Sequence, residues 1–186
     1  MFDRNRGRAT RSDMAGMTPD QSLILIGMPA AGKSTVGRRL AARLQRPFID
    51  TDAVMEARCG QSLQALMAER GVEGFRAAEA RVLCDLQPAE PAVIATGGSV
   101  VYAARGMAAL RRLGTVVFLD CPVAVLAHRV GDPVARGMVI AAGQSLAALH
   151  RERLPLYRRY ADHTIACDDD PPEVVAGRVL RVLSLD

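Results

Sequence analysis

Tryptophan is absent from the 186-residue chain, and aromatic residues are scarce, with four phenylalanines and three tyrosines. Apolar residues nevertheless make up 49% of the sequence, so the core has to be built mainly from alanine, valine, leucine and isoleucine. This composition is typical of an alanine-rich α/β protein. The length fits one domain, which could bury roughly 70% of the surface that its unfolded chain exposes.

Paired cysteines and long apolar runs are also missing. The four cysteines (Cys59, Cys84, Cys121 and Cys167) form no CxxC pair, so neither a zinc site nor a disulfide framework is indicated. No run approaches the roughly 18 apolar residues of a membrane-spanning helix, and no apolar run of a signal peptide follows the N-terminal arginines. We therefore expect a soluble, cytoplasmic protein with reduced thiols and no membrane partner.

The formal net charge of +4 comes from an excess of arginine. Four arginines lie in the first dozen residues, within a segment of low hydrophobicity and no periodicity, and we expect residues 1–21 to be a flexible tail ahead of a single domain over 22–186. No helix has one basic face and no aromatic residues interleave with the basic ones, so small anionic ligands are favoured over nucleic acid.

Short apolar runs alternate with longer helical patterns along this domain. The strands are predicted at 23–26, 47–49, 93–95, 116–119 and 164–166, and the helices at 34–44, 63–70, 72–86, 106–113, 123–129, 146–160 and 172–183. This alternation predicts an α/β fold, a five-stranded parallel sheet flanked by helices, with ligands at the carboxyl ends of the strands.

A GxxxxGK[S/T] loop follows the first predicted strand and precedes a helical pattern. Its residues are Gly27, Met28, Pro29, Ala30, Ala31, Gly32, Lys33 and Ser34, followed by Thr35. Such a loop turns backbone N–H groups toward phosphate oxygens, with a lysine for the β and γ phosphates and a hydroxyl for Mg²⁺. An ordinary glycine-bearing turn would not need the lysine. Lys33 is the only lysine beside 23 arginines, and a compact ammonium fits between phosphate oxygens where a planar guanidinium does not.

Asp50 and Asp52 follow the second predicted strand. In an extended segment both carboxylates would face one pocket, where one could serve Mg²⁺ and the other an acceptor hydroxyl. The alternative is that Asp52 only caps a helix that starts near Val54.

Three further patterns carry weaker signals. Arg76 and Glu79 share a helix face in the pattern FRxxE, where they could pair while Arg76 reaches an anionic substrate, or could be solvated surface charges. Gly97 and Gly98 end a strand, where a ligand could approach the backbone or the chain could simply turn. Residues 131–143 are poor in periodic pattern and contain Arg136, as in a nucleotide lid or a plain loop.

Taken in order, the phosphate loop, the DxD pair, FRxxE, TGG, the lid arginine and the run ERLPLY at 152–157 resemble shikimate kinase, within the nucleoside monophosphate kinase-like fold. The resemblance covers about residues 22–184. It implies a P-loop kinase with a mobile lid at about 131–144, which uses ATP and Mg²⁺ to phosphorylate the 3-hydroxyl of shikimate in aromatic amino-acid biosynthesis. We expect a monomer with a small-molecule substrate.

The resemblance also implies a role for each matching residue. Ser34 and Asp50 are implied on the magnesium side, and Lys33, Asp52 and Arg136 in catalysis. The substrate is implied to contact Asp52, Arg76, Gly97, Gly98 and Arg153. The nucleotide is implied to contact the phosphate loop, Arg129, Arg136 and Asp168.

Two positions depart from the family pattern. Ser99 stands where a third glycine is usual, and the lid reads Arg136, Gly137, Met138, Val139 in place of Arg-Pro-Leu-Leu. Both lie near the acceptor pocket, so a kinase for another small hydroxylated carboxylate is an alternative. A nucleotide-binding module without catalysis is a second alternative, which the intact set of Asp50, Asp52, Arg76 and Arg153 disfavours.

Overall fold

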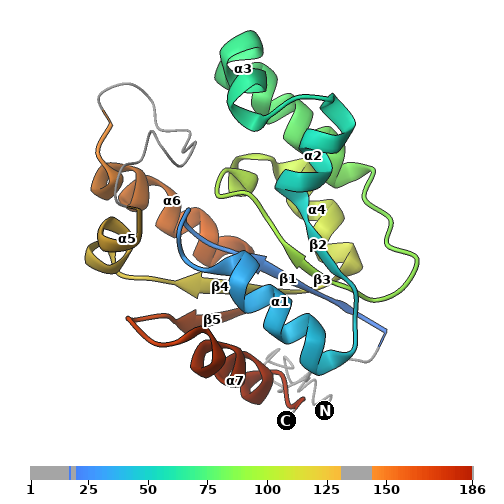
Figure 1. Ribbon diagram of the computed structural model, residues 1–186, viewed down its shortest axis with the longest axis vertical. Helices are drawn as coiled ribbons and strands as arrows, with labels where there is room; N and C mark the ends of the chain where they lie inside the picture. The colour runs from blue at the N-terminus through green and yellow to red at the C-terminus, as the bar shows by residue number, and fades with distance from the viewer. Residues whose placement is uncertain (1–16, 18–19, 131–143, 186) are drawn as a thin grey trace, which may run out of the picture.

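The computed structural model describes residues 17, 20–130 and 144–185 of the chain (Figure 1). One parallel sheet has the strand order β2-β3-β1-β4-β5. Its strands are β1 (Ser22–Ile26), β2 (Phe48–Asp50), β3 (Val93–Ala95), β4 (Gly114–Asp120) and β5 (His163–Ala166). The helices are α1 (Lys33–Leu44), α2 (Thr51–Cys59), α3 (Leu63–Cys84), the 3₁₀ turn η1 (Val100–Tyr102), α4 (Ala104–Leu113), α5 (Val123–Val130), α6 (Leu146–Tyr160) and α7 (Pro172–Val182).

The central strand β1 pairs with β3 on one side and β4 on the other, and all five of its residues are buried. A strand buried on both faces reads as a continuous apolar run, which is why residues 23–26 were recognisable without alternation. Right-handed crossovers place α1 on one face of the sheet and α4 on the other. Helix α7 packs beside α1, and α3 packs beside α4, so both faces are covered.

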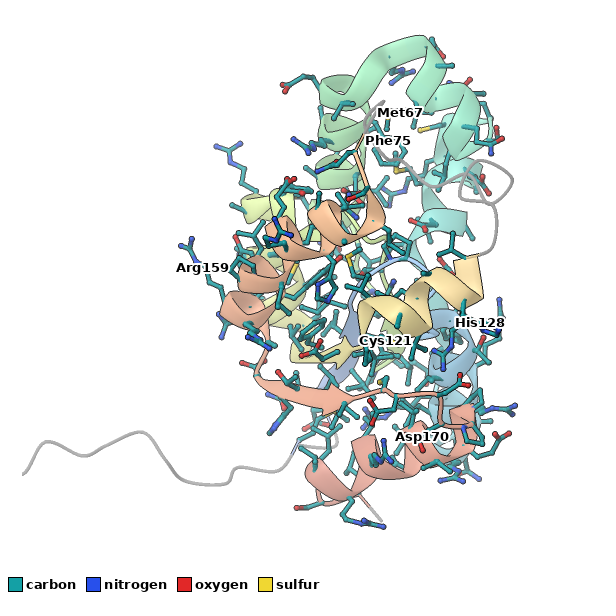
Figure 2. The ribbon with its side chains drawn as sticks, turned by 90° about the vertical axis from the view of Figure 1, so that its left-hand side faces the viewer. Met67, Phe75, Cys121, His128, Arg159 and Asp170 are labelled. Atoms are coloured by element: carbon teal, nitrogen blue, oxygen red, sulfur yellow. The ribbon has the colours of Figure 1, made fainter. Side chains whose placement is uncertain are left out.

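A second, smaller apolar cluster holds α2 and α3 together away from the sheet. Its buried members are Met55, Leu66, Phe75 and Val82, and Met67 packs against them. Figure 2 shows Met67 and Phe75 in this outlying lobe. The lobe lies beyond the carboxyl end of β2, so it forms one wall of any binding site at that edge of the sheet.

The predicted fold class is confirmed, and each of the five predicted strands is present to within about two residues. The separate helices predicted on either side of Gly71 are also found, because Gly71 breaks α3 with φ 64° and ψ −175°. Helix α2 is not among the helices predicted above, but the alternative for Asp52 had a helix starting near Val54. The helix begins earlier, at Thr51, and its N-cap is Asp50, with Asp52 in the first turn. The two carboxylates are therefore not alternate residues of an extended segment.

Part of the predicted tail and lid falls outside the described residues. Within the first of these segments, Met17 is buried in the main core cluster. Of the predicted lid, Gln144 is described, whereas Arg136 is not. None of the described helices is long and apolar enough to cross a membrane.

Candidate active site

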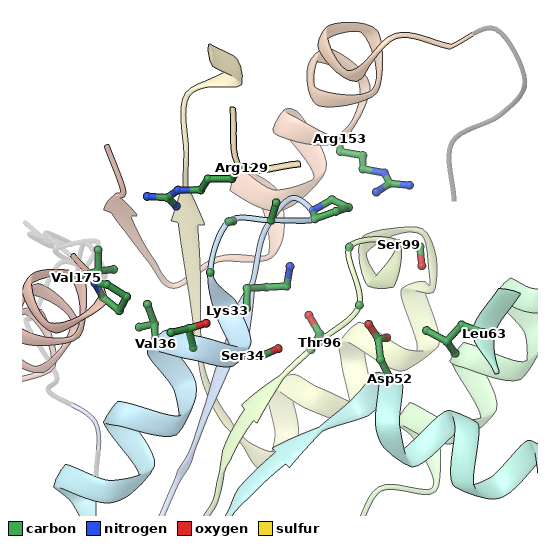
Figure 3. Close-up of a pocket in the computed structure, with 18 of the residues that line it drawn as sticks. Lys33, Ser34, Val36, Asp52, Leu63, Thr96, Ser99, Arg129, Arg153 and Val175 are labelled. Carbon is green, nitrogen blue, oxygen red and sulfur yellow. The ribbon is translucent and has the colours of Figure 1, made fainter. Parts of the chain in front are cut away.

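A cleft of about 730 Å³ opens at the carboxyl ends of β1 and β3, where the phosphate loop, Asp52 of the DxD pair and the TGG turn meet. Figure 3 shows Arg129 and Val175 at one end of the cleft, Asp52, Leu63 and Ser99 at the other, and Lys33 between them. Its wall includes residues 29–36 and 96–99, together with Asp52, Arg129 and Arg153. The topology thus brings together groups that are more than one hundred residues apart in the sequence.

The phosphate loop has the backbone conformation that its glycines allow. Gly27 has φ 149° and Gly32 has φ 90°, both in the region that favours glycine. A Cβ on Gly27 would lie 2.8 Å from the carbonyl oxygen of Leu119, so the loop also passes too close to β4 for any side chain at this position. Ala30 carries a positive φ of 63° without being glycine. The loop ends directly in α1, whose N-terminal N–H groups favour an anion.

Lys33 is buried at the base of the loop, with 8% of its surface exposed. Its Nζ donates to the carbonyl oxygens of Gly27 at 2.9 Å and Met28 at 2.8 Å. Burial lowers the pKa of Lys33 from 10.5 to about 8, although the nearby carboxylate of Asp52 acts in the opposite direction. The ammonium is therefore mostly charged at neutral pH and is held where a phosphate would contact the loop.

Ser34 and Asp50 form the oxygen pair expected on the magnesium side. The Ser34 hydroxyl donates to Asp50 Oδ2 at 2.8 Å, and the backbone N–H of Asp52 donates to Asp50 Oδ1 at 3.1 Å. No group of three or more His, Cys, Asp or Glu side chains that could hold a metal occurs within residues 20–130 and 144–185. One hydroxyl and one carboxylate suit Mg²⁺, which keeps water ligands and takes the rest of its shell from substrate phosphates.

Two carboxylates, that of the half-buried Asp52 and that of the buried Glu79, flank the TGG turn. A Cβ on Gly97 would lie 2.6 Å from Asp52 Oδ1 and 2.8 Å from Glu79 Oε1. Burial raises the pKa of Asp52 to about 6, with the positive charge of Lys33 acting against it. Burial also raises the pKa of Glu79 to about 7. Gly97 is thus required because both carboxylates occupy the space that a Cβ would take. Asp52 remains largely ionised at neutral pH.

Glu79 does not form the helix-surface pair with Arg76 that the FRxxE spacing allowed. Its carboxylate accepts from the hydroxyl of Ser99, which lies 2.8 Å from Oε1 and 2.9 Å from Oε2. Glu79 is 4% exposed and so is not a solvated surface charge. The departure from glycine at position 99 therefore supplies a hydrogen-bond donor to a buried acid.

Arg153 and Arg76 lie near each other, although only Arg153 lines the main cleft. Arg153 is 4% exposed and lines the main cleft, whereas Arg76 lines a small adjoining pocket of about 60 Å³ to which Arg153 also contributes. Both guanidinium groups lie near the ring of Tyr102. The carbonyl oxygen of Gly98 accepts from the Tyr157 hydroxyl at 2.6 Å, which fixes the turn against α6. The structure thus brings the predicted substrate residues into one neighbourhood.

The predicted adenine residues lie at the opposite end. Arg129 donates to the carbonyl oxygen of Asp168 at 3.0 Å and pairs with Asp169 at 3.6 Å. Asp168 itself does not line the cleft, but Asp170 and Pro172 of the same segment do. Arg129 therefore links α5 to the segment after β5. Arg136 lies outside the described residues, so the structure does not place it.

Sequence reasoning missed several residues that shape this site. Thr96, whose hydroxyl donates to the carbonyl oxygen of Leu25 at 3.0 Å, was read only as part of the TGG turn. Tyr102 gave no signal at all. The scarcity of aromatic residues was the one available hint that a tyrosine has a specific role. Of the three tyrosines, two contact site residues: Tyr102 and Tyr157.

Comparison with known proteins gives consistent matches over most of the chain. The family model described as shikimate kinase matches residues 29–184. The shikimate kinase of Nitratidesulfovibrio vulgaris is 43% identical over 153 residues, which cover 78% of this chain and 86% of that protein. That of Thermobifida fusca is 38% identical over 161 residues, covering 86% and 93%. A solved structure of shikimate kinase from Acinetobacter baumannii in complex with shikimate has a TM-score of 0.81 and 32% identity, and covers 89% of this chain and 94% of that one.

Proposed function

The chain belongs to the shikimate kinase family, and from this premise we propose that it transfers the γ-phosphoryl group of ATP to the 3-hydroxyl of shikimate. The observation that carries the proposal is that one cleft of about 730 Å³ is lined by Lys33 and Ser34 of the phosphate loop and also by Asp52 and Arg153. A donor nucleotide and a small acidic acceptor can therefore be held face to face. Catalysis then consists mainly of positioning and charge stabilisation.

The phosphate end binds and neutralises the donor. Loop N–H groups and the N-terminus of α1 would contact the phosphates, and Lys33 would exchange its bonds to Gly27 and Met28 for phosphate oxygens. Bound Mg²⁺ would supply further charge neutralisation on the phosphates, and Ser34 and Asp50 are the residues that would hold it. Arg136 is proposed to reach the phosphates as well, while Arg129 and the segment 168–172 would contact adenine.

The other end of the cleft, with Asp52 and Arg153, would hold the hydroxyl of the acceptor substrate. Asp52 reaches the cleft from the first turn of α2 and is mostly ionised at neutral pH, because its pKa of about 6 lies below 7. Its carboxylate would accept a hydrogen bond from the acceptor hydroxyl and take up its proton as the phosphoryl group transfers. Gly97 and Gly98 leave room for the ring, and Arg153 with Arg76 would bind the carboxylate.

We also propose that the protein works as a cytoplasmic monomer with no nucleic-acid or membrane partner. The described walls of the small-molecule cleft come from a single chain, with contributions from the phosphate loop, α2, α6 and α7. Sedimentation at micromolar concentration tests the monomer, with a dimeric mass as the contrary result.

The activity itself is tested by coupled ADP release with purified full-length protein, ATP, Mg²⁺ and shikimate. Turnover that depends on all three is expected, and a panel containing quinate and gluconate should be slower by orders of magnitude in kcat/KM. Turnover no faster than background with shikimate would refute the proposed function. Asp52→Asn is the matched active-site control, because it keeps the volume of the side chain and removes the charge.

A further inference from the structure

The ring of Tyr102 is in contact with both arginines that are proposed to bind the substrate carboxylate. The guanidinium carbon of Arg76 lies 4.1 Å from the ring centroid, and that of Arg153 lies 5.3 Å from it. Tyr102 ends η1, which packs against α3 and α6, the two helices that carry these arginines. One aromatic side chain therefore connects two cations from distant parts of the chain.

The hydroxyl of Tyr102 adds a directional link. It accepts from Nε of Arg153 at 3.3 Å and donates to the carboxylate of Glu152, which also accepts from Gln144 Nε2 at 2.8 Å. Burial raises the pKa of Tyr102 above its usual value, which favours the protonated hydroxyl that donates to Glu152. The hydroxyl thus fixes the side chain of Arg153, which is 4% exposed.

We propose that Tyr102 is a positioning residue that sets the spacing of Arg76 and Arg153 before the substrate carboxylate arrives. Two guanidinium groups repel each other, and each long side chain loses rotamer freedom on binding. The negative face of an aromatic ring attracts both guanidinium groups and so offsets their mutual repulsion. Holding the two side chains in place before the substrate binds reduces the rotamer entropy that is lost on binding. Tyr102 lines the small pocket beside the main cleft, so it acts through the arginines.

This inference rests on the proposed function, and its test separates the ring from the hydroxyl. Tyr102→Leu removes both, and the KM for shikimate should rise roughly tenfold or more while the KM for ATP changes less than about twofold. Tyr102→Phe keeps the ring, and the rise should be smaller, about threefold. Tyr160→Leu is the matched control, because Tyr160 also lies near an arginine, with its ring centroid 5.8 Å from the guanidinium carbon of Arg159, and does not line the cleft.

Thermal unfolding of each variant identifies a loss of folding. An unchanged KM for shikimate in folded Tyr102→Leu, or an equal rise in both KM values, would overturn the proposal. If Tyr102→Leu does not fold, the same comparison of the two KM values is made with Tyr102→Phe. Crystal structures of the ligand-free wild type and of a folded Tyr102 variant give a readout that needs no turnover: the guanidinium groups should move apart in the variant, and unchanged positions would refute the inference even if shikimate proved not to be the substrate.

Discussion

The hydroxyl of Ser99 donates to the carboxylate of Glu79, with its Oγ 2.8 Å from Oε1 and 2.9 Å from Oε2. A donor to the ionised form stabilises it and opposes the effect of burial, which raises the pKa of Glu79 to about 7. Ser99→Ala and Ser99→Gly should therefore raise the pKa of Glu79 further. Carboxyl-detected NMR titration of protein labelled at glutamate would measure this, and an unchanged pKa in both variants would contradict the role of Ser99.

The raised pKa of Glu79 predicts a specific dependence of stability on pH. The folded state binds the proton more tightly than the unfolded state, whose pKa is near 4.5, so stability is lost as pH rises from about 4.5 through about 7. For a buried group this shift amounts to roughly 3 kcal/mol. Glu79→Gln keeps the size of the side chain and should flatten the free energy of unfolding over this range. Urea denaturation at pH 4.5, 6 and 7.5 measures the difference, and parallel curves for wild type and variant would contradict it.

Gly97 should tolerate no side chain. A Cβ there would lie 2.6 Å from Asp52 Oδ1 and 2.8 Å from Glu79 Oε1, so Gly97→Ala should push Asp52 away from the acceptor hydroxyl and lower kcat/KM about 100-fold. Gly177→Ala in α7 is the matched control, because its Cβ meets only the end of Arg43 at 4.0 Å. That variant should keep its activity and unfold with about 0.5–1 kcal/mol more stability. Equal activities of the two variants would show that the TGG turn can accommodate a Cβ at position 97.

The single lysine should not be replaceable by arginine. Lys33 is 8% exposed and sits between the loop carbonyls, where a planar guanidinium has no matching space. Lys33→Arg and Lys33→Met should both reduce kcat/KM by roughly 10³-fold. ADP release over a range of ATP concentrations measures kcat/KM, and calorimetric titration with ADP checks whether the loop still binds nucleotide. An active Lys33→Arg enzyme would refute the geometric argument.

The fold and the phosphate-binding end of the cleft were easier to predict from the sequence than the acceptor end. Strands β1 and β4 were recognisable because buried parallel strands are continuous apolar runs, and Lys33 because its loop is contiguous in sequence. Helix α2 was expected only in the alternative for Asp52, because DxD at a strand end has the same pattern whether the chain continues extended or, as here, Asp50 caps a helix. The contacts of Tyr102 and Ser99 could not be predicted, because their partners come from α3 and α6 and depend on how those helices pack.

The contact between Ser34 and Asp50 predicts how the enzyme should depend on Mg²⁺. Asp50 has two functions in the structure: Oδ2 accepts from the Ser34 hydroxyl at 2.8 Å, and Oδ1 caps α2 by accepting from the N–H of Asp52 at 3.1 Å. Asparagine is an equally good N-cap but carries no charge, so Asp50→Asn should leave the thermal stability within about 1 kcal/mol of wild type.

The same variant should need more metal, with the Mg²⁺ concentration for half-maximal rate raised roughly 10- to 100-fold, because a hard cation loses a charged oxygen ligand. Ser34→Ala should shift this concentration in the same direction while leaving the cap of α2 intact. Asp50→Ala removes the carboxylate and the cap together, so it alone should lose both stability and metal affinity. A titration in which Asp50→Asn follows the wild-type curve would show that the metal is not held by this carboxylate.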